Sequence, residues 1–207
     1  HGENLWWLFR TRDFIPEYDK IYCVSEPVRK QVIARFPELA DRTEVLLNFI
    51  DIKQVQRRSE EPLSDPQYTG ELKFLTVGRA SEEKGYDIAV QITAELKKRG
   101  LCFKWFIIGD GRDLNKLRTM AKEYQVEQEI IFLGMRENPA PYVKSCDLYL
   151  QPSRHEGYPI TIVEARSLQK VIIASDIPSM REQIRDGENG YLCPLDVMQF
   201  ADKIQKV

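Results

Sequence analysis

The sequence is poor in the residues that build metal centres, disulfide frameworks and membrane spans. It has two histidines, and its four cysteines lie far apart without a CxxC pair, so a zinc site is not expected. No apolar stretch approaches the ~20 residues of a transmembrane helix, and the start, HGENLWWLFR, lacks the long apolar core of a signal peptide. These absences favour a cytoplasmic protein in which Cys23, Cys102, Cys146 and Cys193 are buried, reduced thiols.

The sequence also lacks an excess of charge of either sign, because its acidic and basic residues nearly balance. The formal net charge is -2, so the chain has no field that would attract a polyanion, and no nucleic acid partner is expected. Any phosphate ligand must therefore be held by a local site. Near the start, Trp6, Trp7, Leu8 and Phe9 form a short apolar cluster. Packing against the protein itself is the simpler interpretation, and peripheral contact of a parent protein with the inner face of a membrane is the alternative.

A polar, proline-bearing stretch divides the chain. Residues 51–70, DIKQVQRRSEEPLSDPQYTG, carry no sustained periodicity and are interpreted as a linker. Before them, residues 1–50 contain one strand-helix-strand unit, too small for a complete domain, with Ser25 as the helix N-cap and Pro27 in the first turn. After them, residues 71–207 alternate apolar strand-like runs with helical patterns. This alternation predicts an α/β domain with a doubly wound, Rossmann-like parallel sheet.

Ligands of such sheets bind outside the carboxyl ends of the strands, and charged residues follow the first strand of the predicted domain. After LKFLTV comes GRASEEKG, which begins at Gly78. Arg79 and Lys84 can converge there on an anion at the start of the next helix. As surface charges they would instead pair with Glu82 and Glu83.

The next predicted strand ends in GDGRDL. Gly109 and Gly111 permit close approach by a ligand, and a tight turn without a ligand explains them equally well. Leu114 occupies the third glycine position of the dinucleotide fingerprint. A hydride-transferring dehydrogenase is therefore disfavoured.

The most informative motif is SRHEGYPITIVEA, residues 153–165. Gly157 favours a sharp turn and Pro159 suits a first helical turn, so that the N–H groups around them can face an anion. Glu156 and Glu164 both lie where they can face the strand ends, and carboxylates there suit the hydroxyls of a sugar. Taken singly, Glu164 is equally explained as a first-turn acid stabilised by the helix dipole and Glu156 as an exposed loop acid.

Together these motifs resemble a known family. GRASEEKG, the GDG turn, IIFLG and above all the E-x7-E spacing of Glu156 and Glu164 resemble the carboxyl-terminal domain of family-four retaining glycosyltransferases, which have the GT-B fold. IPSMREQIRDGENGYL resembles the segment that follows in that family, and YDKIYCVSE and VLLNFID resemble the end of its amino-terminal domain and the crossover. The resemblance covers about residues 18–207. His155 departs from the family pattern, in which an aromatic residue is common at that position.

The resemblance implies roles for the candidate residues. Arg79 and Lys84 would bind the donor diphosphate and stabilise the charge that develops on it. Glu156 would contact the transferred sugar beside its anomeric carbon without acting as a nucleophile, and Glu164 would accept hydrogen bonds from the ribose hydroxyls. The other donor contacts would come from Gly78, Gly109 and Gly111, from Gly134, Met135 and Arg136 against the nucleobase, and from Gly157, Tyr158, Pro159 and Ile160 against the sugar and distal phosphate.

The implied parent enzyme transfers a hexosyl group from a UDP- or GDP-sugar to a glycan or lipid acceptor, with retention and without a metal or other cofactor. The acceptor would bind an amino-terminal domain of which this chain holds only the tail. A fragment that binds the donor without transferring the sugar is therefore expected. Two alternatives stay open: another GT-B enzyme, such as a nucleotide-sugar 2-epimerase, and a non-catalytic nucleotide-binding or protein-interaction module.

Overall fold

The computed structural model describes residues 18–207, and the apolar cluster at residues 6–9 lies outside this range. The first described unit contains β1 (Ile21–Cys23), α2 (Glu26–Arg35), the 3-10 helix η2 (Pro37–Arg42) and β2 (Thr43–Val45), with the two strands parallel. Ser25 caps α2 by accepting a hydrogen bond from the N–H of Val28 at 3.4 Å, as predicted.

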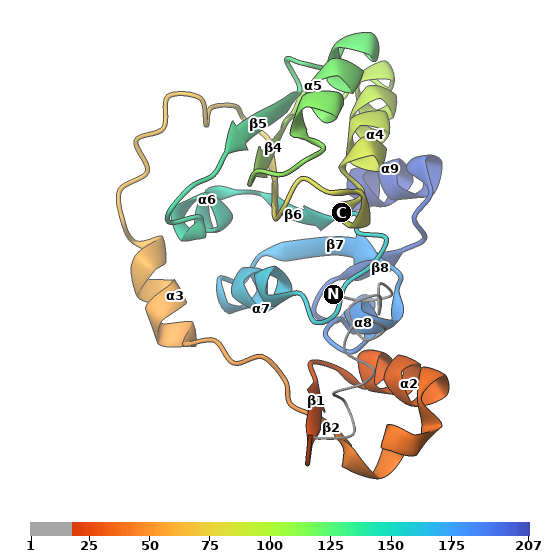
Figure 1. Ribbon diagram of the computed structural model, residues 1–207. Coiled ribbons are helices and arrows are strands. Elements are labelled where there is room, and N and C mark those ends of the chain that lie inside the picture. The colour runs from red at the N-terminus through yellow and green to blue at the C-terminus, as the bar shows by residue number, and fades with distance from the viewer. Residues whose placement is uncertain (1–17) are drawn as a thin grey trace.

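A helix occupies the first half of the segment in which we expected no periodic element. α3 (Ile52–Ser59) begins after Asp51, whose carboxylate accepts a hydrogen bond from the N–H of Gln54 at 3.0 Å. It packs against α6 and α7 of the following domain (Figure 1). Sequence reasoning missed α3 because Ile52 and Val55 are its only large apolar residues, too few to show a helical period. The boundaries at residues 50 and 70 stay predictions.

The part of the chain that follows α3 forms the predicted doubly wound α/β domain. Its sheet has six strands in the order β5-β4-β3-β6-β7-β8, and all of its pairs are parallel (Figure 1). The strands are β3 (Lys73–Val77), β4 (Lys104–Ile108), β5 (Ile130–Gly134), β6 (Leu148–Gln151), β7 (Val171–Ser175) and β8 (Tyr191–Cys193). The helices are η3 (Glu82–Lys84), α4 (Tyr86–Lys98), α5 (Leu114–Glu123), α6 (Ala140–Ser145), α7 (Ile160–Ser167), α8 (Pro178–Arg181) and α9 (Val197–Lys206).

Helices cover both faces of the sheet, and each face has its own apolar core. One core includes Trp105 together with residues of α4, α5 and α9, and the other includes Phe106 together with residues of α6, α7 and α8. Adjacent strand residues point to opposite faces, so Trp105 and Phe106 enter different cores. This double burial explains why the strands read as almost continuous apolar runs.

The cysteines follow the prediction at three positions. Cys23, Cys146 and Cys193 are buried free thiols, and burial raises the pKa of Cys146 to about 12. The prediction is wrong for Cys102, which is exposed in the turn between α4 and β4 while the neighbouring Phe103 packs into the core. Within residues 18–207, no helix is long and apolar enough to cross a bilayer.

Candidate functional site

The loops that follow β3 and β4 touch each other at the carboxyl edge of the sheet. The N–H of Gly78 donates to the carbonyl of Ile108 at 2.9 Å. A Cβ added to Gly109 would lie 2.0 Å from the carbonyl oxygen of Gly78, and one added to Gly111 would lie 2.3 Å from that of Ala80. The glycines of the GDG turn are therefore required by this loop-to-loop contact.

An ion pair joins the loop after β3 to the loop after β6. The ammonium of Lys84 lies 2.7 and 3.0 Å from the two carboxylate oxygens of Glu156. Gln151 and Ser153 also donate to Oε1 of Glu156, at 2.9 and 2.7 Å. The Glu156 side chain is only 9% exposed, so it is not an exposed loop acid, and Lys84 is not a surface charge paired within its own loop.

Sequence reasoning missed the residues that hold these two loops together. Arg154 donates to both carboxylate oxygens of Asp87 at 2.7 and 2.6 Å, and its N–H donates to the carbonyl of Glu83 at 2.8 Å. Burial acts to raise the pKa of Asp87, but the hydrogen bonds from Arg154 hold it below the ordinary value. Gly85 has a φ of +67°, and a Cβ there would lie 1.9 Å from the carbonyl oxygen of Pro152. The Lys-Gly step directly before a helical pattern was the available signal.

Two groups with unused hydrogen-bonding capacity lie in and around this loop. Arg79 is exposed and makes no ion pair with another residue of the range 18–207. Tyr86 is 1% exposed, and its hydroxyl has no hydrogen-bond partner among the described residues. A Cβ added to Gly78 would lie 2.9 Å from that hydroxyl and 3.3 Å from Cε of Lys84. The loop after β3 thus brings an uncommitted cation, a second cation and a buried hydroxyl into one short segment.

The predicted anion-binding turn lies at the start of α7. The helix begins at Ile160, and Pro159 immediately before it has extended backbone angles. The carbonyl of Pro159 accepts a hydrogen bond from Nε2 of Gln183 at 3.3 Å, which ties this turn to the segment after α8. The N–H groups of a first helical turn have no partner within the helix, and the helix dipole adds positive potential there. Gly157 and Tyr158 precede this turn, so the predicted stretch can present N–H groups to an anion.

Glu164 lies in a different environment from Glu156. It lines a cavity of about 40 Å³ between α3, α6 and α7. Burial raises the pKa of Glu164, and the nearby positive charge of Arg58 on α3 acts against this rise. The structure therefore directs one carboxylate of the E-x7-E motif toward the loop after β3 and the other toward the segment that precedes the domain.

The three residues predicted to lie against a nucleobase are at the end of β5 and the start of the loop that follows, since Gly134 is the last residue of that strand. Gly134 has a φ of +73°, and the side chain of Met135 is 73% exposed. The guanidinium of Arg136 points to Asp65 of the preceding segment, with Nη2 at 2.8 Å from the carboxylate. Met135 thus offers an exposed apolar surface in this loop, whereas the Arg136 side chain is already engaged.

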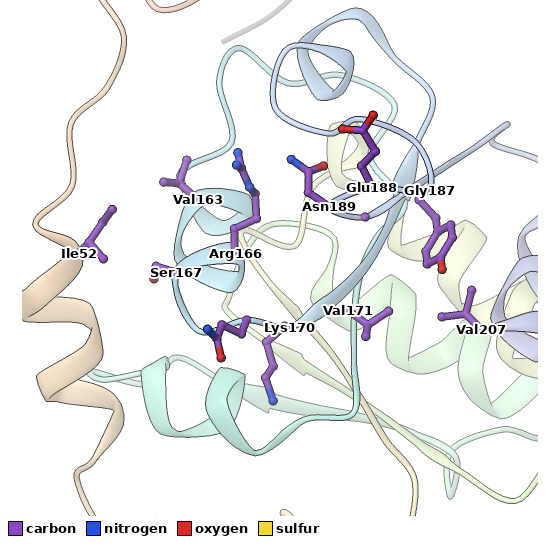
Figure 2. Close-up of a pocket in the computed structure, with 13 residues that line it drawn as sticks. Ile52, Val163, Arg166, Ser167, Lys170, Val171, Gly187, Glu188, Asn189 and Val207 are labelled. Carbon is purple, nitrogen blue, oxygen red and sulfur yellow. The ribbon is translucent and has the colours of Figure 1, made fainter.

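A larger cavity lies elsewhere in the described chain. It measures about 740 Å³ and is lined by the end of α7, the first residue of β7 and the loop before β8, including Arg166, Val171 and Glu188 (Figure 2). The cavity therefore lies near the amino ends of β7 and β8, whereas ligands of α/β sheets bind at the carboxyl ends of the strands. A smaller cavity, of about 90 Å³, lies beside Glu156 and is also lined by Gln31 of α2. Because ligands of α/β sheets bind at the carboxyl ends of the strands, we place the candidate site at that edge of the sheet.

The order of the six-stranded parallel sheet and the loops at its strand ends agree with the carboxyl-terminal domain of a GT-B glycosyltransferase. Over 99% of its length the chain superposes on 58% of HepE of Anabaena, a structure solved in complex with UDP, with a TM-score of 0.81 at 19% identity. The family model for glycosyl transferases group 1 matches residues 58–207, and the chain belongs to this family.

Two curated relatives show the same relationship at the level of sequence. The chain is 29% identical over 193 residues to an uncharacterized glycosyltransferase of Methanocaldococcus jannaschii, a match that covers 91% of the chain and 45% of that protein. It is 26% identical over 183 residues to N-acetylgalactosamine-N,N'-diacetylbacillosaminyl-diphospho-undecaprenol 4-alpha-N-acetylgalactosaminyltransferase of Campylobacter jejuni, covering 87% of the chain and 48% of that enzyme. The chain thus spans about half the length of the curated relatives it matches.

Proposed function

We propose that this chain is the donor-binding part of a retaining hexosyltransferase that takes its sugar from a UDP- or GDP-sugar. The proposal rests mainly on the ion pair between Lys84 and Glu156, in which Nζ lies 2.7 Å from Oε1. The two residues lie on loops that follow neighbouring strands of a group 1 glycosyltransferase domain. The complex of HepE with UDP supports a nucleoside diphosphate as the ligand.

The donor diphosphate would bind between the loop after β3 and the start of α7. Arg79 and Lys84 supply positive charge from one side, and the N–H groups near Ile160 supply hydrogen bonds from the other. These groups stabilise the charge that develops on the leaving diphosphate, so the proposed reaction proceeds without a metal or other cofactor. The buried hydroxyl of Tyr86 lies within the same loop region and adds a potential donor.

The environment of Glu156 supports a contact role rather than nucleophilic attack. Its Oε1 already accepts hydrogen bonds from Lys84, Gln151 and Ser153, so the lone pairs of this oxygen are engaged within the protein. In the proposed reaction the bond between the anomeric carbon and the diphosphate oxygen breaks, and the acceptor oxygen bonds to the same face of that carbon. The acceptor proton passes to the leaving diphosphate.

The nucleoside would extend toward α3 and α6. Glu164 lines a cavity together with Arg58, and in the proposed complex its ionised carboxylate accepts hydrogen bonds from the ribose hydroxyls. Met135, exposed in the loop after β5, offers an apolar surface to the base. The proposed donor therefore lies along the carboxyl edge, with the sugar near Glu156 and the base near β5.

A glycan or lipid acceptor would approach from the amino-terminal unit. A cavity of about 90 Å³ lies between α2 and the Glu156 loop, which supports an approach of the acceptor from this side. The name of the Campylobacter relative includes a diphospho-undecaprenol, which supports an acceptor of this class, and a lipid-linked acceptor would bring the parent enzyme to a membrane surface. Because transfer requires the acceptor to be held in line with the anomeric carbon, we expect the 207-residue chain to bind donor without transferring the sugar.

Binding to a panel of UDP- and GDP-sugars tests the proposal. A ligand present at 100 times its Kd stabilises the folded chain by about 2.7 kcal/mol, which a thermal-shift measurement resolves. We expect one nucleoside series to raise the melting temperature and the other to have less effect. No shift with any member of the panel would contradict a donor-binding role and favour an interaction module. Release of a free epimerised sugar from the bound donor would identify the epimerase alternative.

A further inference from the structure

The segment before the sheet domain holds the loop after β5 at two points. Nη2 of Arg58 donates to the carbonyl of Glu137 at 2.9 Å, and Nδ2 of Asn138 donates to the carbonyl of Arg58 at 2.9 Å. Farther along the same segment, Asp65 pairs with Arg136 at 2.8 Å. A stretch that the sequence pattern marks as a linker thus contacts the loop expected to lie against the nucleobase.

Asp65 is a partly buried carboxylate, and both of its oxygens accept hydrogen bonds. Its side chain is 10% exposed. Its Oδ2 accepts from Nη2 and Nε of Arg136 at 2.8 and 3.2 Å and from the hydroxyl of Tyr142 at 2.9 Å, while Oδ1 accepts from the N–H of Gln67 at 2.9 Å. Burial acts to raise the pKa of Asp65, but these hydrogen bonds hold it below the ordinary value. Asp65 is therefore ionised at neutral pH.

Arg136 connects this carboxylate to the backbone at the end of β5 and the start of the loop that follows. Its Nη1 donates to the carbonyl of Met135 at 3.1 Å and also to the carbonyl of Leu133. Between these carbonyls lies Gly134, in the left-handed region at a φ of +73°. The guanidinium is planar and its donors have a fixed fork geometry, so the position of Asp65 fixes the directions of both carbonyls.

A second ion pair, which joins the same segment to α6, provides a contrast. Glu60 and Lys144 of α6 lie 2.5 Å apart, but their side chains are 69% and 44% exposed. Such exposed pairs contribute little to stability, and this pair contacts no group of the loop after β5 in the described chain. The Asp65–Arg136 pair differs because it is largely buried and continues into the loop backbone.

We propose that Asp65 is a positioning residue for nucleobase recognition, acting through Arg136 on the backbone of Leu133 to Met135. The inference rests on the proposed function and extends it, since it names the element that shapes the nucleoside end of the site. It requires that nucleoside affinity depend on Asp65 while diphosphate affinity does not, because Lys84 and the start of α7 are held by other contacts.

The test is isothermal titration calorimetry of the chain with UDP, GDP and inorganic pyrophosphate. Asp65→Asn keeps the shape of the side chain and removes its charge. We expect it to weaken binding of the preferred nucleoside diphosphate about tenfold, the loss of one charge-assisted hydrogen bond, while pyrophosphate affinity changes less than about twofold. Glu60→Gln, the matched control, should change neither affinity.

Arg136→Gln should reproduce the loss, and the Asp65→Asn, Arg136→Gln double variant should add nothing further, because both residues act on one element. The ratio of the two affinities is independent of the folded fraction, and melting temperatures measured alongside identify a variant that fails to fold. Equal losses for UDP and pyrophosphate, or an Asp65→Asn variant that binds UDP normally, would overturn the positioning role. A wild-type chain that binds pyrophosphate but neither UDP nor GDP would instead refute the proposed function.

Discussion

The two ends of the candidate site are held by different parts of the chain. At the diphosphate end, Glu156 is supported by Gln151 and Ser153, both fully buried at the end of β6, and by Lys84 from the neighbouring loop. At the nucleoside end, the loop after β5 depends on Asp65, which precedes the first strand of the sheet. The sheet itself therefore preorganises one end, and a segment packed onto the domain from outside completes the other.

In the proposed site, the groups near the reacting bond and the groups that select the nucleoside are therefore held in different ways. Groups that would act on the reacting bond are fixed by the core, whose side chains are close-packed and shift little. Groups that would select the nucleoside are fixed by a few polar contacts across the sequence, such as the bond between Arg58 and Glu137. We expect substitutions of the packed residues at the first end, such as Lys84 and Gly85, to affect folding and binding together, and substitutions at the second end to affect selectivity.

The largest effect should come from Gly85→Ala at the diphosphate end. An alanine there would place Cβ 1.9 Å from the carbonyl oxygen of Pro152 and adopt a φ of +67°. We expect a loss of roughly 2–4 kcal/mol in the free energy of unfolding, from backbone strain and the clash combined, measured by urea denaturation. Gly100→Ala is the control, because its φ is +80° and nothing lies within 4 Å of its Cβ. A similar loss in both variants would show that the contact with Pro152 is unimportant.

A smaller effect at the same end should distinguish its two cations. Lys84→Ala removes the partner of a carboxylate that is 9% exposed, so it should lower both stability and pyrophosphate affinity, the affinity by roughly ten- to a hundredfold. Arg79→Ala should lower the affinity by a comparable factor and leave the melting temperature unchanged, because Arg79 makes no ion pair with another described residue. Calorimetry and thermal melting of both variants test this pattern. Unchanged affinity in both would refute the phosphate assignment.

The smallest effect should come from Glu164→Gln at the nucleoside end, and it should have opposite signs for binding and stability. Since an amide is a weaker acceptor than a carboxylate, UDP affinity should fall about tenfold while pyrophosphate affinity is retained. Burial raises the pKa of folded Glu164, so the stability associated with its proton is present below its unfolded pKa of ~4.3 and is lost as pH rises through the folded pKa.

A glutamine at position 164 carries no charge that burial would destabilise. Glu164→Gln should therefore raise the melting temperature of the unliganded chain at pH 7. This gain should disappear toward pH 4, where Glu164 of the wild type is protonated. Melting curves across this pH range provide the measurement. A variant that is less stable than the wild type at pH 7, with equal losses of UDP and pyrophosphate affinity, would assign Glu164 a packing role.

Local patterns in the sequence were sufficient to predict most of the fold. Each strand of the sheet falls within a predicted apolar run, and Ser25 caps α2 as expected, because strands buried on both faces and capped helices leave local signals. Cys102 was misassigned because its apolar neighbours Leu101 and Phe103 indicate burial, although the side chain faces solvent.

The parts of the site that could not be predicted are those made by distant residues. Asp65 and Arg136 are 71 positions apart, and neither residue type indicates a partner at that distance. Asp87 and Arg154 likewise meet only after β3 and β6 become neighbours. The family resemblance assigns ligand contacts to motif residues, whereas these pairs depend on how segments pack, which motif spacing does not encode.

The support of the loop after β5 by the preceding segment has a consequence for building chimeras. A donor domain exchanged between relatives at residue 71 would carry the whole sheet, yet it would leave Arg136 facing a foreign segment instead of Asp65. A junction placed before Asp51 would transfer the helix, the carboxylate and the loop together, because α3 and its cap begin there. The unit that can be exchanged with its specificity intact is therefore larger than the unit that forms the sheet.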